Sequence, residues 1–376
     1  MKTCISSAFI VGGGIAGLSA AIALSRAGIR CDVVEIAEAP LGSSIGISGR
    51  AAEALAELGV YDAARGLAHV WEVGANVPTV SDAEGRQLSP GPTRPTWPGA
   101  IESIGIYRPK LLEIMSEKAR RLGATIRRGL TVRDFRFVGD AVVVTTTDGE
   151  RKRYDLLVGA DGIKSTMRAS LLPDAPSPAY AGQLSIRWMA PGPALPDEGW
   201  FVSPVGQLGF YSHPEGTIYV AAHVDMEEEE RLSDEEVHEV YLRLLNSISA
   251  PQVVELRKRY TRDAELIATR FESILVPPPW HVERAVLIGD AAHATTAHLG
   301  MGGGMALEDS VVLGQCLEGA ATLPQALEDF MKRRYERVRT VVETSRQLSR
   351  REQENADPAG NQKLMTEAFN VLAKPY

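Results

Sequence analysis

Short apolar runs alternate with amphipathic segments in the first part of the chain. Residues 8–11 (AFIV) form an uninterrupted apolar run, which predicts a buried strand. Apolar residues then recur at helical spacing from Leu18 to Leu24, and Gly28 is expected to end that helix. Residues 31–35 (CDVVE) predict a second strand. A strand–helix–strand order of this kind predicts a parallel sheet.

The same two patterns recur further along the chain. They predict helices at 51–59, 109–122 and 323–351, and strands within 125–148, at 156–159 and at 285–288. On the long C-terminal helix, Leu327, Phe330, Val338, Val341 and Leu348 are expected to face inward.

The middle of the chain follows a different period. Between 176 and 280, polar and apolar residues alternate in stretches such as 217–224 (TIYVAAHV), which predicts an antiparallel sheet with one covered face. Ser233 and Glu236 form the capping-box pattern at the start of a helix. Prolines and glycines between 76 and 100 predict short strands and loops.

These patterns together predict an α/β fold in three parts. Residues 1–75, 101–175 and 281–322 are expected to form one discontinuous α/β layer that binds a nucleotide. Residues 76–100 and 176–280 are expected to form a mainly antiparallel β domain, inserted in that layer, and residues 323–376 a C-terminal helical segment.

Composition narrows the class of protein. The 376 residues are 44% apolar and 23% charged, which is ordinary for a soluble protein with a large core. The net charge of -8 argues against a nucleic-acid partner and against binding to an anionic membrane surface. The basic clusters 151–153 and 332–334 are interpreted as solvated faces, and the acidic run 227–230 as a solvated loop.

Cysteine usage and the N-terminal segment bear on the compartment. Cys4, Cys31 and Cys316 form no CxxC pair, so we expect three buried or half-buried thiols in a reducing compartment, and no metal site. Residues 6–25 lack charge, as a signal peptide or a membrane span would. Three consecutive glycines interrupt them, which favours a strand, a turn and a helix, and hence a cytoplasmic protein.

The first glycine cluster carries specific chemistry. Gly12, Gly14 and Gly17 form GxGxxG between a predicted strand and helix, and Glu35 ends the next strand. The glycines allow a tight turn, close approach of a pyrophosphate and close helix packing, while Glu35 can accept hydrogen bonds from ribose hydroxyls. The pattern predicts binding of an ADP-containing dinucleotide at the helix N-terminus.

Three further motifs follow in order along the chain. They are 107–112 (YRPKLL), 157–165 (LVGADGIKS) followed by Arg168, and 289–293 (GDAAH). Together with the glycine turn, they resemble the single-component (group A) FAD-dependent aromatic monooxygenases, the para-hydroxybenzoate hydroxylase-like family. The resemblance implies a Rossmann-like FAD layer of the GR2 type with an inserted β-sheet substrate domain. It is weakest over 176–280, where the substrate would be recognised.

The resemblance also implies roles for individual residues. Glu35 would bind the adenosine ribose, Arg108 the diphosphate region, Asp290 the ribityl chain, and the 300–304 segment the flavin ring. Asp161 would serve FAD and the nicotinamide. The expected cofactor-binding residues are Gly12, Gly14, Ile15, Ala16, Gly17, Glu35, Arg108, Asp161, Gly162, Gly289, Asp290, Gly300, Gly302 and Gly303. From the residues alone, Asp161 and Asp290 are equally suited to capping the helices that follow them.

The implied reaction is a hydroxylation. No second GxGxxG occurs, so NADH or NADPH is expected as a transient co-substrate that reduces a mobile flavin. Reduced flavin and O2 would form a C4a-hydroperoxyflavin, which hydroxylates a small aromatic or N-heteroaromatic compound bearing a hydroxyl or carboxylate. A reductase or halogenase of the same fold and a flavin-binding sensor remain alternatives, and the protein is expected to be a monomer or homodimer.

Candidates for substrate handling lie on the predicted β domain and beside the second glycine cluster. Tyr211 and His213 share strand parity and are proposed to bind or deprotonate a hydroxyl, while Arg187 is proposed to hold a carboxylate. His213 is equally compatible with a simple turn residue. His298 and Met301 are proposed to line the substrate pocket.

Other positions carry weaker expectations. The family generally has a proline and a glutamine where this chain has Ala297 and Met301, which makes the flavin-side wall less rigid and more apolar. Tyr219 and His223 are interpreted as core or rim residues. His69 is interpreted as a surface residue, and His293 as a structural neighbour of the flavin.

Overall fold

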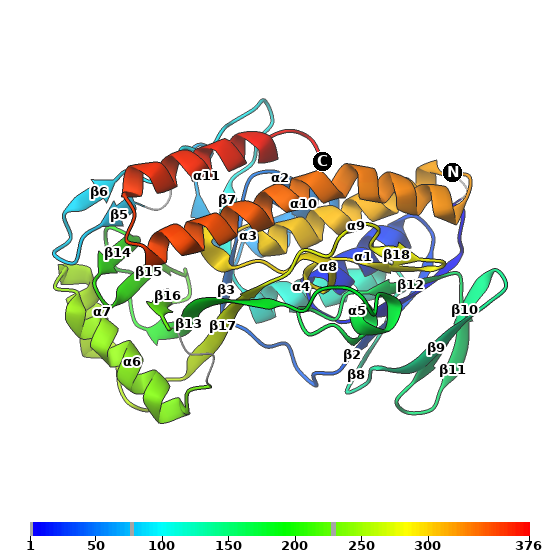
Figure 1. Ribbon diagram of the computed structural model, residues 1–376, viewed down its shortest axis with the longest axis horizontal. Helices are drawn as coiled ribbons and strands as arrows, with labels where there is room; N and C mark the ends of the chain where they lie inside the picture. Colours follow the sequence, from blue (N-terminus) through cyan, green and yellow to red (C-terminus); the bar gives the residue numbers. More distant parts are fainter. Residues whose placement is uncertain (1–2, 76–78, 227–230) are drawn as a thin grey trace.

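The structure is a computed structural model that describes residues 3–75, 79–226 and 231–376 (Figure 1). The acidic run 227–230, interpreted above as a solvated loop, lies outside these residues. Among the described residues, no helix is both long and apolar enough to cross a membrane.

A six-stranded sheet forms the centre of the main α/β layer. Its strand order is β18-β19-β12-β1-β2-β8, and every neighbouring pair is parallel except β18 with β19. The strands are β1 (Ser7–Val11), β2 (Arg30–Glu35), β8 (Thr125–Arg128), β12 (Leu156–Gly159), β18 (His281–Val282) and β19 (Ala285–Leu287). The predicted parallel β1–α1–β2 unit is confirmed, with α1 at Ile15–Arg26.

A seven-stranded sheet forms the second layer. Its order is β17-β13-β16-β15-β14-β5-β6, and all neighbouring pairs are antiparallel except β14 with β5. The strands are β5 (Thr79–Ser81), β6 (Gln87–Ser89), β13 (Ala179–Pro191), β14 (Gly199–Ser203), β15 (Gly206–Ser212), β16 (Thr217–Asp225) and β17 (Leu266–Ser273). The predicted antiparallel pattern is therefore confirmed.

The two faces of this sheet differ in chemistry. One face is apolar and packs against α6 (Asp234–Ser247) and α7 (Pro251–Arg259), which lie at one end of the molecule (Figure 1). The capping box of Ser233 and Glu236 is present at the start of α6. The opposite face carries polar and aromatic side chains, among them Tyr211 and His223, and turns toward β3 of the main α/β layer, where Tyr211 contacts Ser44.

Two three-stranded sheets complete the β structure, in the orders β3-β7-β4 and β11-β10-β9. Their strands are β3 (Ser44–Ile47), β4 (His69–Trp71), β7 (Ser103–Tyr107), β9 (Val132–Val138), β10 (Ala141–Thr146) and β11 (Arg151–Tyr154). The basic cluster 151–153 is exposed on β11, as predicted.

The remaining helices pack around the main sheet and along the molecule. They are α2 (Arg50–Glu57), α3 (Tyr61–Arg65), α4 (Arg108–Arg121), α5 (Thr166–Leu171), α8 (Asp290–His293), η1 (Ala297–Leu299), α9 (Gly302–Gly319), α10 (Leu323–Gln353) and α11 (Pro358–Leu372). Figure 1 shows α10 running lengthwise beside α9 toward the seven-stranded sheet. The five residues predicted to face inward on α10 are all buried. Cys31 and Cys316 are buried, Cys4 is half-buried, and none is in a disulfide.

The interpretation of 332–334 as a solvated face is wrong for Arg334. This side chain is fully buried and pairs with Glu308 and Asp309 of α9 at 2.8 Å each. Arg337 also pairs with Glu308, at 2.6 Å. Burying a charge is costly unless opposite charges and hydrogen bonds satisfy it, so this network requires all of its members together. It joins α10 to α9.

Candidate cofactor and substrate sites

The glycine turn after β1 has the geometry that a dinucleotide needs. Gly12 has φ of +109°, and a Cβ atom there would lie 2.2 Å from the Ala160 carbonyl oxygen. A Cβ atom at Gly17 would lie 1.8 Å from the Gly12 carbonyl oxygen, so helix α1 approaches the turn only because this residue is glycine. At Gly14 the nearest atom would be Nη2 of Arg108, 4.0 Å away, so the backbone there is open to a ligand.

Glu35 stands at the end of β2 beside this turn. One carboxylate oxygen accepts a hydrogen bond from the Gly13 N–H at 2.6 Å, and the other from the Ala37 N–H at 2.8 Å. A carboxylate oxygen accepts more than one hydrogen bond, so both retain capacity for ribose hydroxyls. Ile15 and Ala16, also expected at the cofactor site, are buried in the first turn of α1.

Arg108 and Asp290 carry unpaired charges near the same turn. Neither side chain makes a hydrogen bond or ion pair with any other residue that the structure describes, and both are exposed. Surrounding protein nevertheless raises the pKa of Asp290 by desolvation, partly offset by the charges of His293 and Arg108. Asp290 follows β19 at the C-terminal edge of the main sheet, which is where ligands bind in open α/β sheets.

Asp161 caps the helix that follows it and Asp290 does not, a difference that the sequence alone left open. Asp161 accepts hydrogen bonds from the hydroxyls of Ser165 and Thr166 and from the Met167 N–H, so it does fix the start of α5. Asp290 has no such capping bond, which leaves its carboxylate free for a ligand. Gly162 follows Asp161 with φ of +78° and open space at the Cβ position.

Arg168 connects the second and third motifs. Its guanidinium donates to the carbonyl oxygens of Ala291 at 2.9 Å and Ile163 at 2.7 Å. Asp309 holds the same region from α9, since its Oδ2 accepts the N–H of Gly289 at 2.9 Å. The segment that presents Asp290 is therefore fixed from two sides.

The second glycine cluster forms the start of α9. Gly300 ends η1 with φ of +68°. A Cβ atom at Gly303 would lie 2.6 Å from Ile45, and one at Gly304 would lie 2.7 Å from Ala51, so these glycines bring α9 close to β3 and α2. The first N–H groups of α9, at Gly302 and Gly303, have no side-chain cap.

Tyr211 and His213 meet at a serine that the sequence did not indicate. The Tyr211 hydroxyl donates to Oγ of Ser44 at 2.7 Å, and Nε2 of His213 lies 2.9 Å from the same oxygen. The Ser44 hydroxyl donates to the Ile106 carbonyl at 2.8 Å, so His213 is the donor to Ser44 and its buried Nδ1 keeps a free lone pair. His213 does lie in the turn after β15, as the alternative held, but its ring is buried.

Electrostatics set the protonation of this group. Burial raises the pKa of Tyr211 well above its usual value, so the phenol stays protonated. Burial lowers the pKa of His213, so its imidazole is neutral at physiological pH and can accept a proton.

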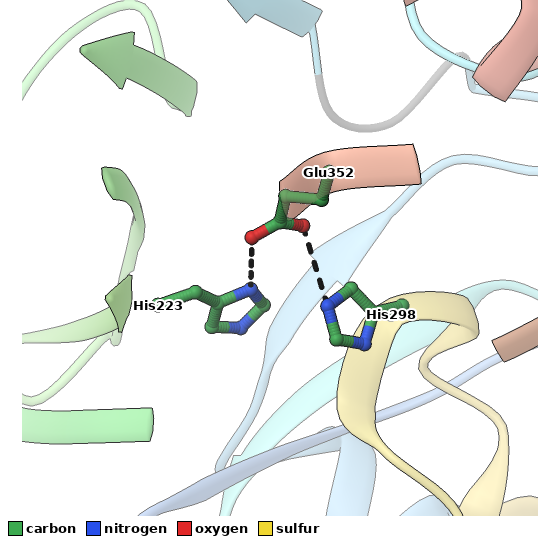
Figure 2. Close-up of side chains that lie close together, drawn as sticks. All are labelled: His223, His298 and Glu352. Atoms are coloured by element: carbon green, nitrogen blue, oxygen red, sulfur yellow. Dashed lines mark ion pairs between the residues drawn. The ribbon is translucent and has the colours of Figure 1, made fainter. Parts of the chain in front are cut away.

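Other predicted residues are placed elsewhere. Arg187 lies on the same sheet face but donates to Oγ1 of Thr269 at 2.8 Å. His69, interpreted as a surface residue, is half-buried: Nδ1 lies 2.8 Å from the Ser212 carbonyl oxygen, and its ring packs against Tyr211. His298 does not line the cavity described next, and instead faces His223 and Glu352 (Figure 2).

A cavity lies between β4, the 94–101 segment, α11 and the start of α9. Its lining includes Ser48, Trp71, Arg94, Trp97, Met301 and Phe369. That Met301 contacts a substrate there stays a prediction. Trp71 lies between this cavity and Tyr211, and the ring centroids of Trp71 and Tyr211 are 5.0 Å apart. Loop residues such as Arg94 and Trp97 carry no periodic signal, so sequence patterns did not identify them.

Arg94 is one of three charged residues that line this cavity, with Arg50, which pairs with Glu53, and the exposed Glu72. Arg94 donates to Oγ of Ser48 and stacks over Phe369 at 4.6 Å, and no carboxylate among the described residues pairs with it. Burial lowers the pKa of Arg94 to about 10. A desolvated guanidinium without a counter-ion favours binding of an anion.

Comparisons with known proteins agree with this geometry. A model of the family described as FAD binding domain matches residues 6–345. The aurachin C monooxygenase/isomerase of Stigmatella aurantiaca is 32% identical over 355 residues, which cover 91% of this chain and 88% of that protein. The 3-hydroxybenzoate 6-hydroxylase of Klebsiella oxytoca is 29% identical, over 92% of this chain and 88% of that protein.

Solved structures share the fold. That of Klebsiella pneumoniae HpxO complexed with FAD and uric acid superposes with a TM-score of 0.81 at 24% identity, over 98% of this chain and 97% of that one. The tetrameric form of 2-methyl-3-hydroxypyridine-5-carboxylic acid oxygenase superposes with a TM-score of 0.71 at 24% identity, over 96% and 92% of the two chains.

Proposed function

Since the chain belongs to the FAD binding domain family of single-component FAD-dependent aromatic hydroxylases, we propose that it uses NADH or NADPH and O2 to hydroxylate a small aromatic or N-heteroaromatic anion. The observation that carries the substrate class is Arg94, a desolvated cation without a carboxylate partner in the cavity beside Met301. The relatives named for 3-hydroxybenzoate and urate act on compounds that are themselves acidic.

The residues at the glycine turn fit FAD. Gly14 leaves open backbone where a pyrophosphate would lie, and the unpaired Arg108 guanidinium lies beside it. Glu35 has acceptor capacity for the adenosine ribose, and Asp290 for the hydroxyls of the ribityl chain. The uncapped N–H groups at the start of α9 would donate to the flavin ring and favour its anionic form.

When bound, FAD supplies the redox chemistry, in which NAD(P)H, a proton, O2 and a ring C–H give NAD(P)⁺, water and a ring C–OH. The chain itself holds and orients the substrate. Arg94 would bind the carboxylate or phenolate oxygen through charge-assisted hydrogen bonds, and Trp71 and Trp97 would pack against the ring. Met301 and Phe369 make the remaining wall apolar, which excludes water from the reacting oxygen.

Tyr211, Ser44 and His213 are proposed to receive a proton from the substrate hydroxyl. Trp71 lies between Tyr211 and the cavity, so the proton would pass by way of a water or a shift of this side chain. The neutral His213 is the proton acceptor through the free lone pair of Nδ1, because its Nε2 donates to Ser44 and the hydroxyls of Tyr211 and Ser44 already act as donors.

The test is a screen of aromatic and N-heteroaromatic acids with the purified yellow protein. A substrate should accelerate NAD(P)H oxidation, and with isotopically labelled O2 one labelled atom should appear in the product hydroxyl. Oxidation that no aromatic ligand accelerates, or that yields only H2O2, would contradict the proposal.

The Arg94→Met variant tests the substrate class. It should raise KM for an anionic substrate roughly 10–100-fold while FAD stays bound, since a charge-assisted hydrogen bond contributes about 1.5–3 kcal/mol. The matched control is Arg153→Met, which removes an exposed arginine of β11 paired with Asp140. Equal KM values in the two variants would rule out Arg94 as the anion-binding group.

A further inference from the structure

His223, His298 and Glu352 come together from three distant segments of the chain. His223 lies on β16, His298 in η1 and Glu352 near the C-terminal end of α10 (Figure 2). Figure 2 shows both imidazole rings turned toward the two oxygens of the one carboxylate. The two histidine side chains are 6% and 3% exposed and the glutamate 13%, so the cluster is largely shielded from solvent.

The distances in this cluster are not those of hydrogen bonds. Nδ1 of His223 lies 3.4 Å from Oε1 of Glu352, and Nε2 of His298 lies 3.3 Å from Oε2. Both nitrogens are buried and lack a hydrogen-bond partner among the described residues. Good N–H···O hydrogen bonds measure about 2.7–3.2 Å, so two buried polar atoms are left unsatisfied.

We propose that His223, His298 and Glu352 form a binding site for a divalent transition-metal ion of the zinc type. The ligand atoms all lie within 4.8 Å of one another. Four ligands placed about 2.0–2.1 Å from a tetrahedral zinc ion are separated by about 3.3–3.4 Å. Each imidazole nitrogen lies about this far from a different oxygen of Glu352, and a metal ion would satisfy both nitrogens at once.

Outer hydrogen bonds fix two of the three ligands. Nδ1 of His298 lies 2.9 Å from the Thr296 hydroxyl, which leaves Nε2 directed at the cluster. Oε1 of Glu352 accepts from the Gln183 amide at 3.1 Å, and Ser349 holds that amide at 2.7 Å. Protein metal sites orient their ligands with this kind of second hydrogen bond.

Metal ligands must be deprotonated, so the proposed site requires Glu352 as a carboxylate and both imidazoles in their neutral form.

Three protein ligands leave one tetrahedral position for water or another oxygen ligand, as in catalytic zinc sites. Trp200 and Phe271 pack against His223 with ring centroids 4.8 Å away, so the surroundings are aromatic. The site is separate from the cavity that contains Arg94, and its occupancy does not depend on the hydroxylation reaction.

The experiment measures metal binding directly in the FAD-loaded protein, without an affinity tag. After dialysis against Co²⁺ or Zn²⁺, the protein should retain one metal ion per chain by elemental analysis. Co²⁺ should also give d–d bands of a tetrahedral nitrogen and oxygen site at wavelengths beyond the flavin absorption. Charge-transfer bands typical of thiolate ligands should be missing.

Variants decide where the ion binds. Glu352→Gln and His298→Ala should each weaken Zn²⁺ binding at least about tenfold. The matched control is His238→Gln, which changes a histidine that contacts Tyr260 in the apolar layer of α6. Retained FAD and an unchanged melting transition show that each variant is folded. A protein that takes up no stoichiometric metal, or uptake that survives both ligand variants, would overturn the proposal and leave a structural ion-pair cluster.

Discussion

Nε2 of His293 and Oδ2 of Asp309 lie 2.6 Å apart, and both side chains are almost completely buried. Because Oδ2 also accepts the Gly289 N–H, this one carboxylate joins α9 to the turn that presents Asp290. Its other oxygen pairs with Arg334. The chain thus uses a buried ion-pair network to position a residue that would contact the cofactor.

We predict that Asp309→Ala destabilises the protein by about 3–5 kcal/mol, because it leaves Arg334 buried with one fewer partner and His293 with none. FAD binding should weaken as well, since the turn at Gly289 loses its hydrogen bond. Urea unfolding and a flavin titration measure the two effects. The control is Asp329→Ala, which removes an exposed i,i+3 pair with Lys332 and should change stability by less than about 0.5 kcal/mol.

The lowered pKa of Asp309 also predicts that the free energy of unfolding decreases at acid pH. Burial raises its pKa, but His293 and Arg334 outweigh burial and lower it to about 2. A depressed carboxylate pKa stabilises the folded state above the unfolded value of about 3.9, and this contribution, on the order of 2 kcal/mol, is lost as pH falls toward 2. Unfolding free energies measured from pH 5 downward should show the loss. In Asp309→Asn the slope over this range should be smaller.

Two glycine substitutions should separate folding from cofactor binding. Gly17→Ala places a Cβ atom 1.8 Å from the Gly12 carbonyl, so it should prevent correct folding of the turn. Gly14→Ala meets no protein atom closer than 4.0 Å, so stability should hold while FAD affinity falls at least about tenfold, or about 1.4 kcal/mol. Thermal unfolding and flavin fluorescence titration measure these. Gly319→Ala, in open space at the end of α9, is the control.

Asp290→Ala is predicted to have opposite effects on the two forms of the protein. Without FAD, the desolvated carboxylate has a raised pKa and no hydrogen-bond partner among the described residues, so its removal should not lower stability. With FAD, the lost charged acceptor should weaken binding roughly 10–100-fold. Melting temperatures of both forms test this. A loss of stability confined to the flavin-free protein would show that Asp290 has a purely structural role.

The pH dependence of turnover should reveal the protonation of His213. Burial lowers the pKa of His213 below its usual 6.5, and only the neutral ring accepts a proton. kcat/KM for a hydroxylated substrate should therefore fall as pH drops through a value below 6.5, and His213→Gln should remove this limb. Ser44→Ala should lower the rate without abolishing folding, since Tyr211 then loses one hydrogen-bond acceptor. An identical acid limb in His213→Gln would exclude this role.

Local patterns were enough to predict the geometry of the glycine turn after β1. Gly12, Gly14 and Gly17 act within one strand–turn–helix, so their spacing alone implies their geometry. The position of Glu35 follows from the end of the next strand. The alternation in β15 likewise predicted that Tyr211 and His213 share a face, and their ring centroids are 5.4 Å apart.

Residues whose role depends on distant contacts were not predictable in this way. Ser44, Arg94 and Glu352 lie in three different parts of the sequence, and only the tertiary fold gives each its partners. Arg334 was misread because a cluster of basic residues usually faces solvent, and the acidic partners that bury it lie on another helix. His223 was interpreted as a core residue, and its burial is confirmed, but its acidic neighbour is on α10.

Helix α10 is long enough to contact both α9 and the seven-stranded sheet. Near its middle, Arg334 is locked to α9, and near its end Glu352, Ser349 and Gln353 contact the seven-stranded sheet. Arg334 and Glu352 are separated by 18 residues, which is about 27 Å along a helix. Because α10 is attached at both points, it couples movements of the six-stranded and the seven-stranded sheets. If the seven-stranded sheet rotated during turnover, α10 would be strained or Glu352 would move away from the two histidines.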